Sequence, residues 1–250
     1  GNKFLCVRLL HLQKKQKESC PVHSKLLHNF QYLKEEKSNF GVFLDSSPDR
    51  WGRMLIKRRE TLSARAENRS VRTLFESDFL LGVYDENRMG ALRFKTDLNG
   101  SFLDDSKTLA APPWTSIRDL EYASLQLENE NITETDARKW LNMLLAPGSS
   151  LGGARPKANV KDDNGNLWIA KFPSKNDEKD MGAWELLANR LAKQCNIQVP
   201  ECQSKSFSSQ RHTFLSKRFD RGQNGQRIHF ASAMTMLGLQ DGDDFSTGAS

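Results

Sequence analysis

Small residues and a lysine in the stretch 149–158 could together bind a phosphate group. Gly152, Gly153 and Ala154 form a loop without bulky side chains, so its backbone N–H groups can approach an anion closely. Lys157 adds a positive charge at the end of this loop. No Gly-Lys-Ser/Thr sequence follows, so the loop is not a Walker A motif. Because glycine pairs are also common in ordinary turns, the phosphate interpretation depends on the elements that follow.

The next element is a predicted β-hairpin that carries an inward lysine. Asn164-Gly165 is typical of a type I′ turn, and the flanking residues 157–161 and 167–172 would pair as antiparallel strands. Counting by twos places Lys171 on the face that also carries Leu167 and Ile169. A lysine amine directed toward a core edge or a cleft needs a negative partner.

A glutamate on the following helix is the candidate partner. The sequence predicts a helix over residues 181–195, with Glu185 inside its apolar stripe. The predicted buried stripe consists of Met181, Trp184, Ala188, Leu191, Ala192 and Cys195. A small-residue loop, a strand lysine and a helix glutamate follow one another in this order in protein-kinase amino-terminal lobes. The alternative is a plain hairpin and helix with a lysine that extends to solvent, and pattern alone does not separate the two.

Further elements must position these residues. Residues 40–53 join an apolar run to a capped turn, and a helix follows to about residue 65. Residues 78–94 are expected to form a helix end, a turn and a short strand. Helices are expected at 117–128 and 133–145, and residues 213–221 are expected to form a strand that ends in a polar turn. We expect a domain boundary near residue 112.

A basic segment over residues 50–72 suggests another kind of partner. It holds eight basic residues against Glu60 and Glu67. One hypothesis is a nucleic-acid binder, whose affinity would fall steeply with salt. The other interpretation, which we favour, is a solvated helix face, since no nucleic-acid recognition motif accompanies the charge.

Composition excludes several classes of protein. The 250 residues are 37% hydrophobic, which is enough for packed cores, and the formal net charge is +6. No run of about 18 apolar residues and no secretory pattern occurs, so we expect a cytoplasmic protein without a membrane partner. The four cysteines have no metal-site spacing and are expected to be free thiols in a reducing compartment.

These motifs resemble the HipA-like family, the serine/threonine kinase toxins of bacterial type II toxin–antitoxin modules. The matching segments are Phe40 to Arg53, Ser149 to Ala158, Trp168 to Ser174, Ile197 to Glu201, Phe214 to Arg221, and Arg227 to Gly238. They follow the order of the family and span roughly residues 40–250. The resemblance implies an α+β fold, with a small N-terminal α/β subdomain in residues 1–111 (residues 1–39 match poorly). A kinase-like N-lobe with the start of a C-lobe would occupy residues 112–250.

The resemblance also implies roles for particular residues. Lys171 and Glu185 would be the catalytic ion pair, and ATP with Mg²⁺ would be the cofactors. Ser150 matches a loop serine that family members autophosphorylate. The ATP-binding residues would be Gly152, Gly153, Ala154, Arg155, Pro156, Lys157 and Lys171 at the phosphates, with Lys217, Arg218, Phe219 and Asp220 at the adenine and ribose.

The same resemblance implies partners and exposes a departure from the family pattern. The partners would be a HipB-like helix-turn-helix antitoxin, DNA reached through that antitoxin, and a protein substrate such as an aminoacyl-tRNA synthetase. Residues 222–250 hold no His-Gly-Asp-x-x-x-x-Asn catalytic loop, so we expect no metal site within this chain and little turnover. The alternative function is a catalytically inactive fragment that binds the antitoxin or another protein.

Overall fold

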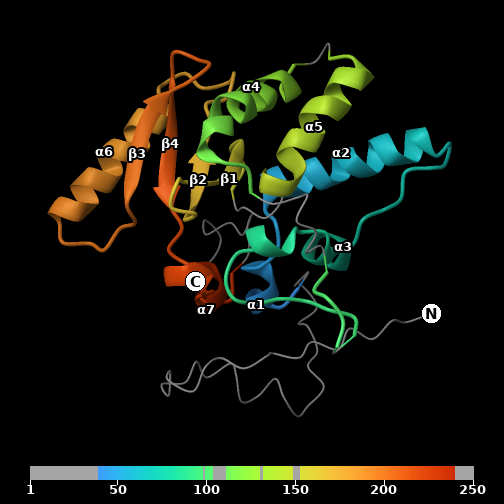
Figure 1. Cartoon of the computed structure of the whole chain (residues 1–250), viewed down its shortest axis with the longest axis horizontal. Helices are drawn as coiled ribbons and strands as arrows, with labels where there is room; N and C mark the ends of the chain where they lie inside the picture. The colour runs from blue at the N-terminus through green and yellow to red at the C-terminus, as the bar shows by residue number, and fades with distance from the viewer. Residues whose placement is uncertain (1–38, 98, 104–110, 130–131, 149–152, 240–250) are drawn as a thin grey trace, which may run out of the picture.

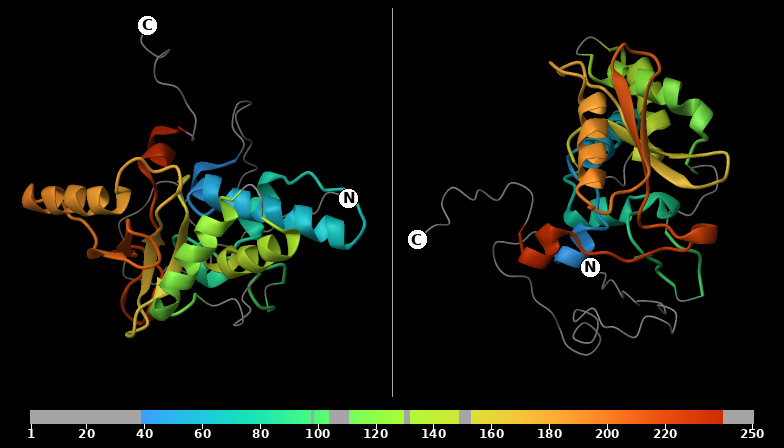
Figure 2. Two further views of the ribbon diagram at one scale, coloured as in Figure 1. Left: turned by 90° about the horizontal axis from the view of Figure 1, so that it is seen from above. Right: turned by 90° about the vertical axis from the view of Figure 1, so that its left-hand side faces the viewer.

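The computed structural model describes residues 39–97, 99–103, 111–129, 132–148 and 153–239. Within these ranges the chain folds into an antiparallel sheet with helices on both faces, as the two views of Figure 2 show. The fold is α+β, as the sequence predicted. The longer helices are α2 (Arg50–Ala66), α4 (Ile117–Leu127), α5 (Glu134–Gly148) and α6 (Met181–Gln194), and the short ones are α1 (Gly41–Leu44), α3 (Glu76–Leu81) and α7 (Ala233–Leu237). Short 3₁₀ segments are η1 (Asp85–Asn87), η3 (Trp114–Ser116) and η4 (Gln223–Gly225).

The sheet has the strand order β1-β2-β4-β3, and all neighbouring strands are antiparallel. Its strands are β1 (Lys157–Lys161), β2 (Leu167–Lys171), β3 (Cys202–Ser206) and β4 (His212–Lys217). The predicted hairpin of β1 and β2 is confirmed, with Lys157 directly opposite Lys171. Directly opposed residues of an antiparallel pair point to the same face, so the two lysines share one face of the sheet.

The hairpin turn differs from the predicted type I′ turn. Gly165 has φ of +78°, but Asn164 is not among the non-glycine residues with positive φ, as a type I′ turn would require. The Asp162 carboxylate instead accepts hydrogen bonds from the backbone N–H groups of Asn164 and Asn166 and from Trp168 Nε1. This local side-chain cap stabilises a longer loop in place of the two-residue turn.

One face of the sheet forms the main core with α2, α4 and α5. Figure 1 shows these three helices together on one side of the strands. Buried members of the core are Trp51, Leu55, Ile117, Leu120, Leu141, Leu144, Val160, Trp168, Ala170, Phe172 and Leu215. The helices predicted at 117–128 and 133–145 are confirmed as α4 and α5. Because α2 shares this core with the sheet, packing continues across the boundary expected near residue 112.

The buried stripe predicted for α6 is wrong. Trp184 is 55% exposed and Leu191 is 52% exposed, so in the described structure this apolar stripe faces away from the sheet and toward solvent. Gly182 instead turns inward, where an added Cβ would lie 2.0 Å from the carbonyl oxygen of His212. Close approach of α6 to β4 at this glycine fixes the rotation of the helix, and Glu185 lies on the inward side with Gly182. The inward position of Glu185 was therefore predicted correctly, but for an incorrect reason.

The strand expected near residues 91–94 is absent from the described structure. Leu92 and Phe94 are buried in a second, smaller cluster with Leu80, outside any strand. The C-terminal end of the described chain also reaches this region: Ser232 N donates to the Asp45 carboxylate at 2.9 Å, and α7 lies beside α1 (Figure 1). The segment after β4 thus connects the sheet with the N-terminal elements.

Candidate functional site

The start of α2 holds the described end of the glycine loop. Gly153 N donates to the Asp49 carboxylate at 2.5 Å, and Trp51 N donates to Gly153 O at 3.2 Å. The buried Trp51 Nε1 donates to Lys157 O at 2.9 Å. Two segments far apart in the sequence therefore form one structural unit around the start of β1.

Gly153 also suits close approach to a charged group. Its φ is +81°, and a Cβ added there would lie 2.9 Å from Lys157 Nζ. This backbone conformation is unfavourable for residues other than glycine, and a side chain at this position would crowd the Lys157 amine. The sequence signal of small residues before a lysine thus corresponds to a real steric requirement.

Lys171 and Glu185 form the ion pair inferred from the sequence. Lys171 Nζ lies 2.5 Å from Glu185 Oε2, and the two side chains are 35% and 25% exposed. The lysine comes from the last residue of β2 and the glutamate from the second turn of α6. Since both side chains are partly exposed, the pair lies at the edge of the core, within reach of a ligand.

Lys157 is the more buried of the two lysines on this face, with 3% exposure. Burial, as the larger cause, and the neighbouring Lys171 amine together lower the pKa of Lys157 to about 8. The carboxylates of Asp49 and Glu185 act in the opposite direction. A bound phosphate would stabilise the charged form of Lys157, because an anion at this distance offsets both desolvation and the repulsion between the amines.

Arg155 braces the other side of the loop. Its guanidinium makes two hydrogen bonds of 2.5 Å to the Asp177 carboxylate and a third of 3.2 Å to Phe172 O. The bond from Asp177 raises the pKa of Arg155 against the effect of burial. Pro156 O accepts from Phe172 N at 2.9 Å, which extends the β1–β2 pairing by one step. These contacts occupy the Arg155 guanidinium, so Arg155 acts as a positioning residue for the loop. The neighbouring Ala154 is exposed.

Comparison with known families identifies this half of the molecule. Residues 149–250 match the HipA-like C-terminal domain. The match covers 102 of the 250 residues and shows that this part of the chain is similar to a HipA-like C-terminal domain. No curated protein and no solved structure matches the chain. The match agrees with the family resemblance over residues 149–250.

Just after β4, the backbone of Phe219 is accessible, whereas the side chains of Arg218 and Asp220 are buried. Phe219 is 55% exposed, and within the described residues its backbone N–H and C=O form no hydrogen bond. Its ring packs edge-on against Phe230 at a centroid distance of 5.0 Å. The backbone of Phe219 is therefore available to an adenine edge, as the resemblance implies.

Arg218 and Asp220, in contrast, are fully enclosed by protein. Both side chains are 0% exposed, and they are joined by bonds of 2.8 and 2.6 Å. Asp220 also accepts from Gly90 N at 2.6 Å and from Arg221 at 2.8 Å. With its oxygens occupied in this way, Asp220 links β4 to the N-terminal elements and presents no exposed carboxylate to a ribose.

The carboxylates near the glycine loop are engaged by protein donors. Among the described residues there is no cluster of three or more histidine, cysteine, aspartate or glutamate side chains that could hold a metal. The carboxylates around the loop are bound to protein donors: Asp49 to Gly153 N, Asp177 to Arg155 and Glu185 to Lys171.

The basic residues of 50–72 are largely paired within the protein. Arg53 is bound to Glu76 through two bonds of 2.6 Å, and Arg69 is bound to Glu60 and Glu67. Arg72 and Arg65 pair with Asp78 and Glu134, and Arg58 donates to Leu127 O. This pairing favours the solvated-face interpretation over nucleic-acid binding.

Sequence reasoning missed Asp49 and Trp51 as part of the site. The capped turn that contains them was recognised, but nothing local indicates that it contacts a loop so distant in the sequence. Ser150 and Gly152 lie outside the described residues. Cys195 and Cys202 are free thiols, as expected. Across the described residues, no helix has the length and apolar character that crossing a bilayer requires.

Proposed function

We propose that the HipA-like domain binds ATP as the nucleotide-binding lobe of a serine/threonine protein kinase, the toxin of a toxin–antitoxin module. The observation that carries the proposal is the Lys171–Glu185 ion pair, with Lys157 opposite Lys171 and Gly153 against the Lys157 amine. This arrangement gathers two amines and the Gly153 end of a small-residue loop near the carboxylates of Glu185 and Asp49. A triphosphate would add charge-assisted contacts to both amines.

Each part of the site would have a distinct task. Lys157 and the loop at Gly153 would bind the terminal phosphates, and Lys171 would bind the α- and β-phosphates while Glu185 holds its position. The Phe219 backbone would meet the adenine edge. Asp49 and Trp51 would act as positioning residues, because they fix the loop without touching the nucleotide.

Regulation would follow from Ser150 at the start of the loop. A phosphate there would add about −1.5 to −2 charges beside the place that ATP phosphates occupy. Electrostatic repulsion would then exclude the nucleotide and stop the reaction. The protein substrate would be translation-related, for example an aminoacyl-tRNA synthetase, and the partner would be a helix-turn-helix antitoxin that brings the complex to DNA.

The test is ATP binding to the 250-residue chain, measured by isothermal titration calorimetry. Lys171→Ala should weaken binding by about tenfold or more, because it removes a charge-assisted contact to the phosphates. The matched control is Lys205→Ala, which removes the same charge from the exposed strand β3 and should leave binding unchanged. Equal affinities for the parent chain and Lys171→Ala would refute the role of Lys171.

A second candidate function, a protein-binding module without catalysis, is favoured by the outer face of α6. Met181, Trp184, Leu187 and Leu191 are between 36% and 55% exposed, an unusual apolar stripe for a solvent-facing helix. This candidate predicts that the parent chain does not bind ATP, whereas Trp184→Asp weakens association with the antitoxin. Tight ATP binding by the parent chain would decide in favour of the first candidate.

A further inference from the structure

A separate cavity lies at the other end of the β1–β2 hairpin from the proposed nucleotide site. Lys157 begins β1 and Lys161 ends it, and the cavity adjoins Lys161 and the hairpin turn. Its volume is about 490 Å³, which lies within the range of about 300–1,000 Å³ typical of small-molecule sites. The other walls come from η1 and from the segment that follows β4.

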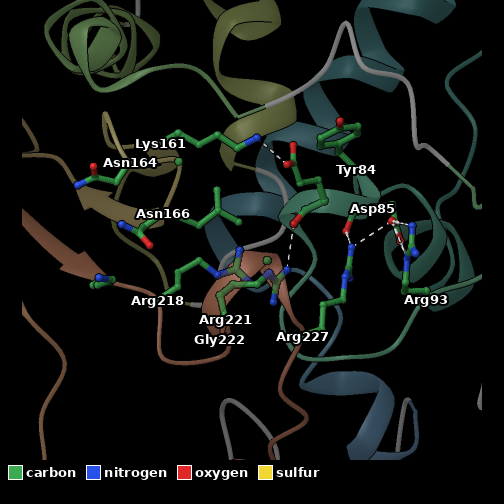
Figure 3. A pocket seen from close by; sticks show the side chains of 15 residues that line it. Tyr84, Asp85, Arg93, Lys161, Asn164, Asn166, Arg218, Arg221, Gly222 and Arg227 are labelled. Atoms are coloured by element: carbon green, nitrogen blue, oxygen red, sulfur yellow. Dashed lines mark hydrogen bonds and ion pairs between the residues drawn. The ribbon is translucent and has the colours of Figure 1, made fainter. Parts of the chain in front are cut away.

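The lining of this cavity is strongly basic. Its basic residues are Arg93, Lys161, Lys217, Arg218, Arg221 and Arg227, and its acidic residues are Asp85 and Glu86. Figure 3 shows Arg93 and Arg227 both directed at the Asp85 carboxylate, with Arg221 and Arg218 lying next to them. Arg93 and Arg227 approach Asp85 to 2.5 and 3.0 Å, so two guanidinium groups share one carboxylate.

Part of the hydrogen-bonding capacity of these cations is unused. Arg227 Nη1 is buried and has no hydrogen-bond partner within the described residues. Lys217 Nζ lies 3.7 Å from Glu201, which is a loose and exposed ion pair. A buried guanidinium N–H without an acceptor is costly, and an oxyanion in the cavity would supply that acceptor.

The charge balance around Arg221 also favours an anion in the cavity. Arg221 is 8% exposed and lies close to Arg218, which shares its Asp220 partner. Burial lowers the pKa of Arg221, and the charge of Arg218 lowers it further. The protein carboxylates therefore do not fully offset the positive charge gathered at this end of the sheet.

We propose that this cavity binds the phosphate group of a small phosphorylated molecule, at the opposite end of the hairpin from the Lys157 and Lys171 amines that are proposed to bind the ATP phosphates. Guanidinium groups present planar pairs of N–H donors that match phosphate oxygens. Arg227 would donate through Nη1, Lys217 would approach from the end of β4, and the rest of the ligand would occupy the remaining volume beside the hairpin turn. The proposal stands whether or not the chain binds ATP.

The test measures binding of inorganic phosphate and of ribose 5-phosphate to the full chain by calorimetry at constant ionic strength. Both should bind saturably, with ribose 5-phosphate the tighter. Arg227→Gln should weaken binding by about tenfold and Lys217→Gln by about threefold, since the first loses a buried donor and the second an exposed charge. Lys205→Gln, which removes a distant exposed charge from strand β3, should have no effect.

Several results would overturn the proposal. They are the absence of saturable phosphate binding, equal weakening by Lys217→Gln and Lys205→Gln, or full binding retained in both Arg227→Gln and Lys217→Gln. Tighter binding of a phosphoserine peptide than of ribose 5-phosphate would overturn the assignment to a small molecule. If Arg227→Gln does not fold, Lys217→Gln decides the question, because its side chain makes only an exposed contact.

Discussion

The two ends of the β1–β2 hairpin are both basic, yet they hold their charges in different ways. At the Lys157 end, two amines face each other and the Lys171–Glu185 pair is partly exposed. At the turn end, Arg218 and Asp220 are fully enclosed and tie the sheet to the segment near Gly90. Flexible lysines at an open edge suit a ligand that comes and goes, whereas the enclosed Arg218–Asp220 pair suits a permanent structural joint in the wall of the cavity at the turn end.

The largest expected effect contrasts one carboxylate from each end. Asp220→Ala would leave buried Arg218 without its charged partner and should cost about 3–5 kcal/mol of unfolding free energy. Glu185→Ala removes half of a partly exposed pair and should cost no more than about 1 kcal/mol. Urea denaturation of both variants measures the difference. Similar losses would contradict the division into a structural joint and an open site.

The next effect tests how the open end is held in place. Trp51→Phe removes the donor to buried Lys157 O and should cost about 1–3 kcal/mol, because a buried acceptor is left unsatisfied. The matched control is Trp140→Phe, whose indole N–H makes no hydrogen bond within the described residues, and which should cost less. Thermal denaturation distinguishes them. A greater loss in the control would show that the Trp51 contact contributes little.

The smallest effect depends on the pKa of Lys157, near 8. ATP affinity should fall by about fourfold between pH 7 and 8.5, as the protonated fraction of the free amine decreases. In Lys157→Arg, which stays charged, this dependence should disappear. Calorimetric titrations at the two pH values provide the measurement, and an equal pH dependence in both proteins would exclude Lys157 as the titrating group.

The same lysine has an opposite effect on stability. The pKa of Lys157 in the folded protein lies below its ordinary value of 10.5, so the unfolded chain binds more protons between pH 8 and 10.5. The free energy of unfolding should therefore increase as pH rises through this window, so the folded protein becomes more stable. Ligand affinity and stability should consequently change in opposite directions at the Lys157 end.

How well each feature could be predicted depended on the range of the interactions that fix it. The hairpin pairing and the helices α4 and α5 follow from local periodicity, and they agree with the sequence prediction. Strand β3 was not predicted, because Cys202–Ser206 is polar and lacks an alternating pattern. It forms a strand because β4 offers a neighbouring edge, which is a tertiary influence.

The rotation of α6 shows the limit of reasoning from apolar residues. Periodicity favoured burial of Trp184 and Leu191, yet the absence of a side chain at Gly182 allowed a closer approach of the helix on another face. That approach depends on where the His212 carbonyl lies, and no local pattern specifies this. The same rotation brought Glu185 to Lys171, so a correct pairing emerged from a different packing.

The sequence by itself determined the hairpin and the order of loop, lysine and helix glutamate, because neighbouring residues along the chain specify strand and helix periodicity, and the family resemblance implied the α+β class. Only the tertiary structure decided that Asp49 and Trp51 hold the glycine loop and that Arg218 and Asp220 are sealed inside. The contacts of Asp49 and Trp51 join segments 104 and 106 residues apart, and they depend on how whole elements pack around a shared core.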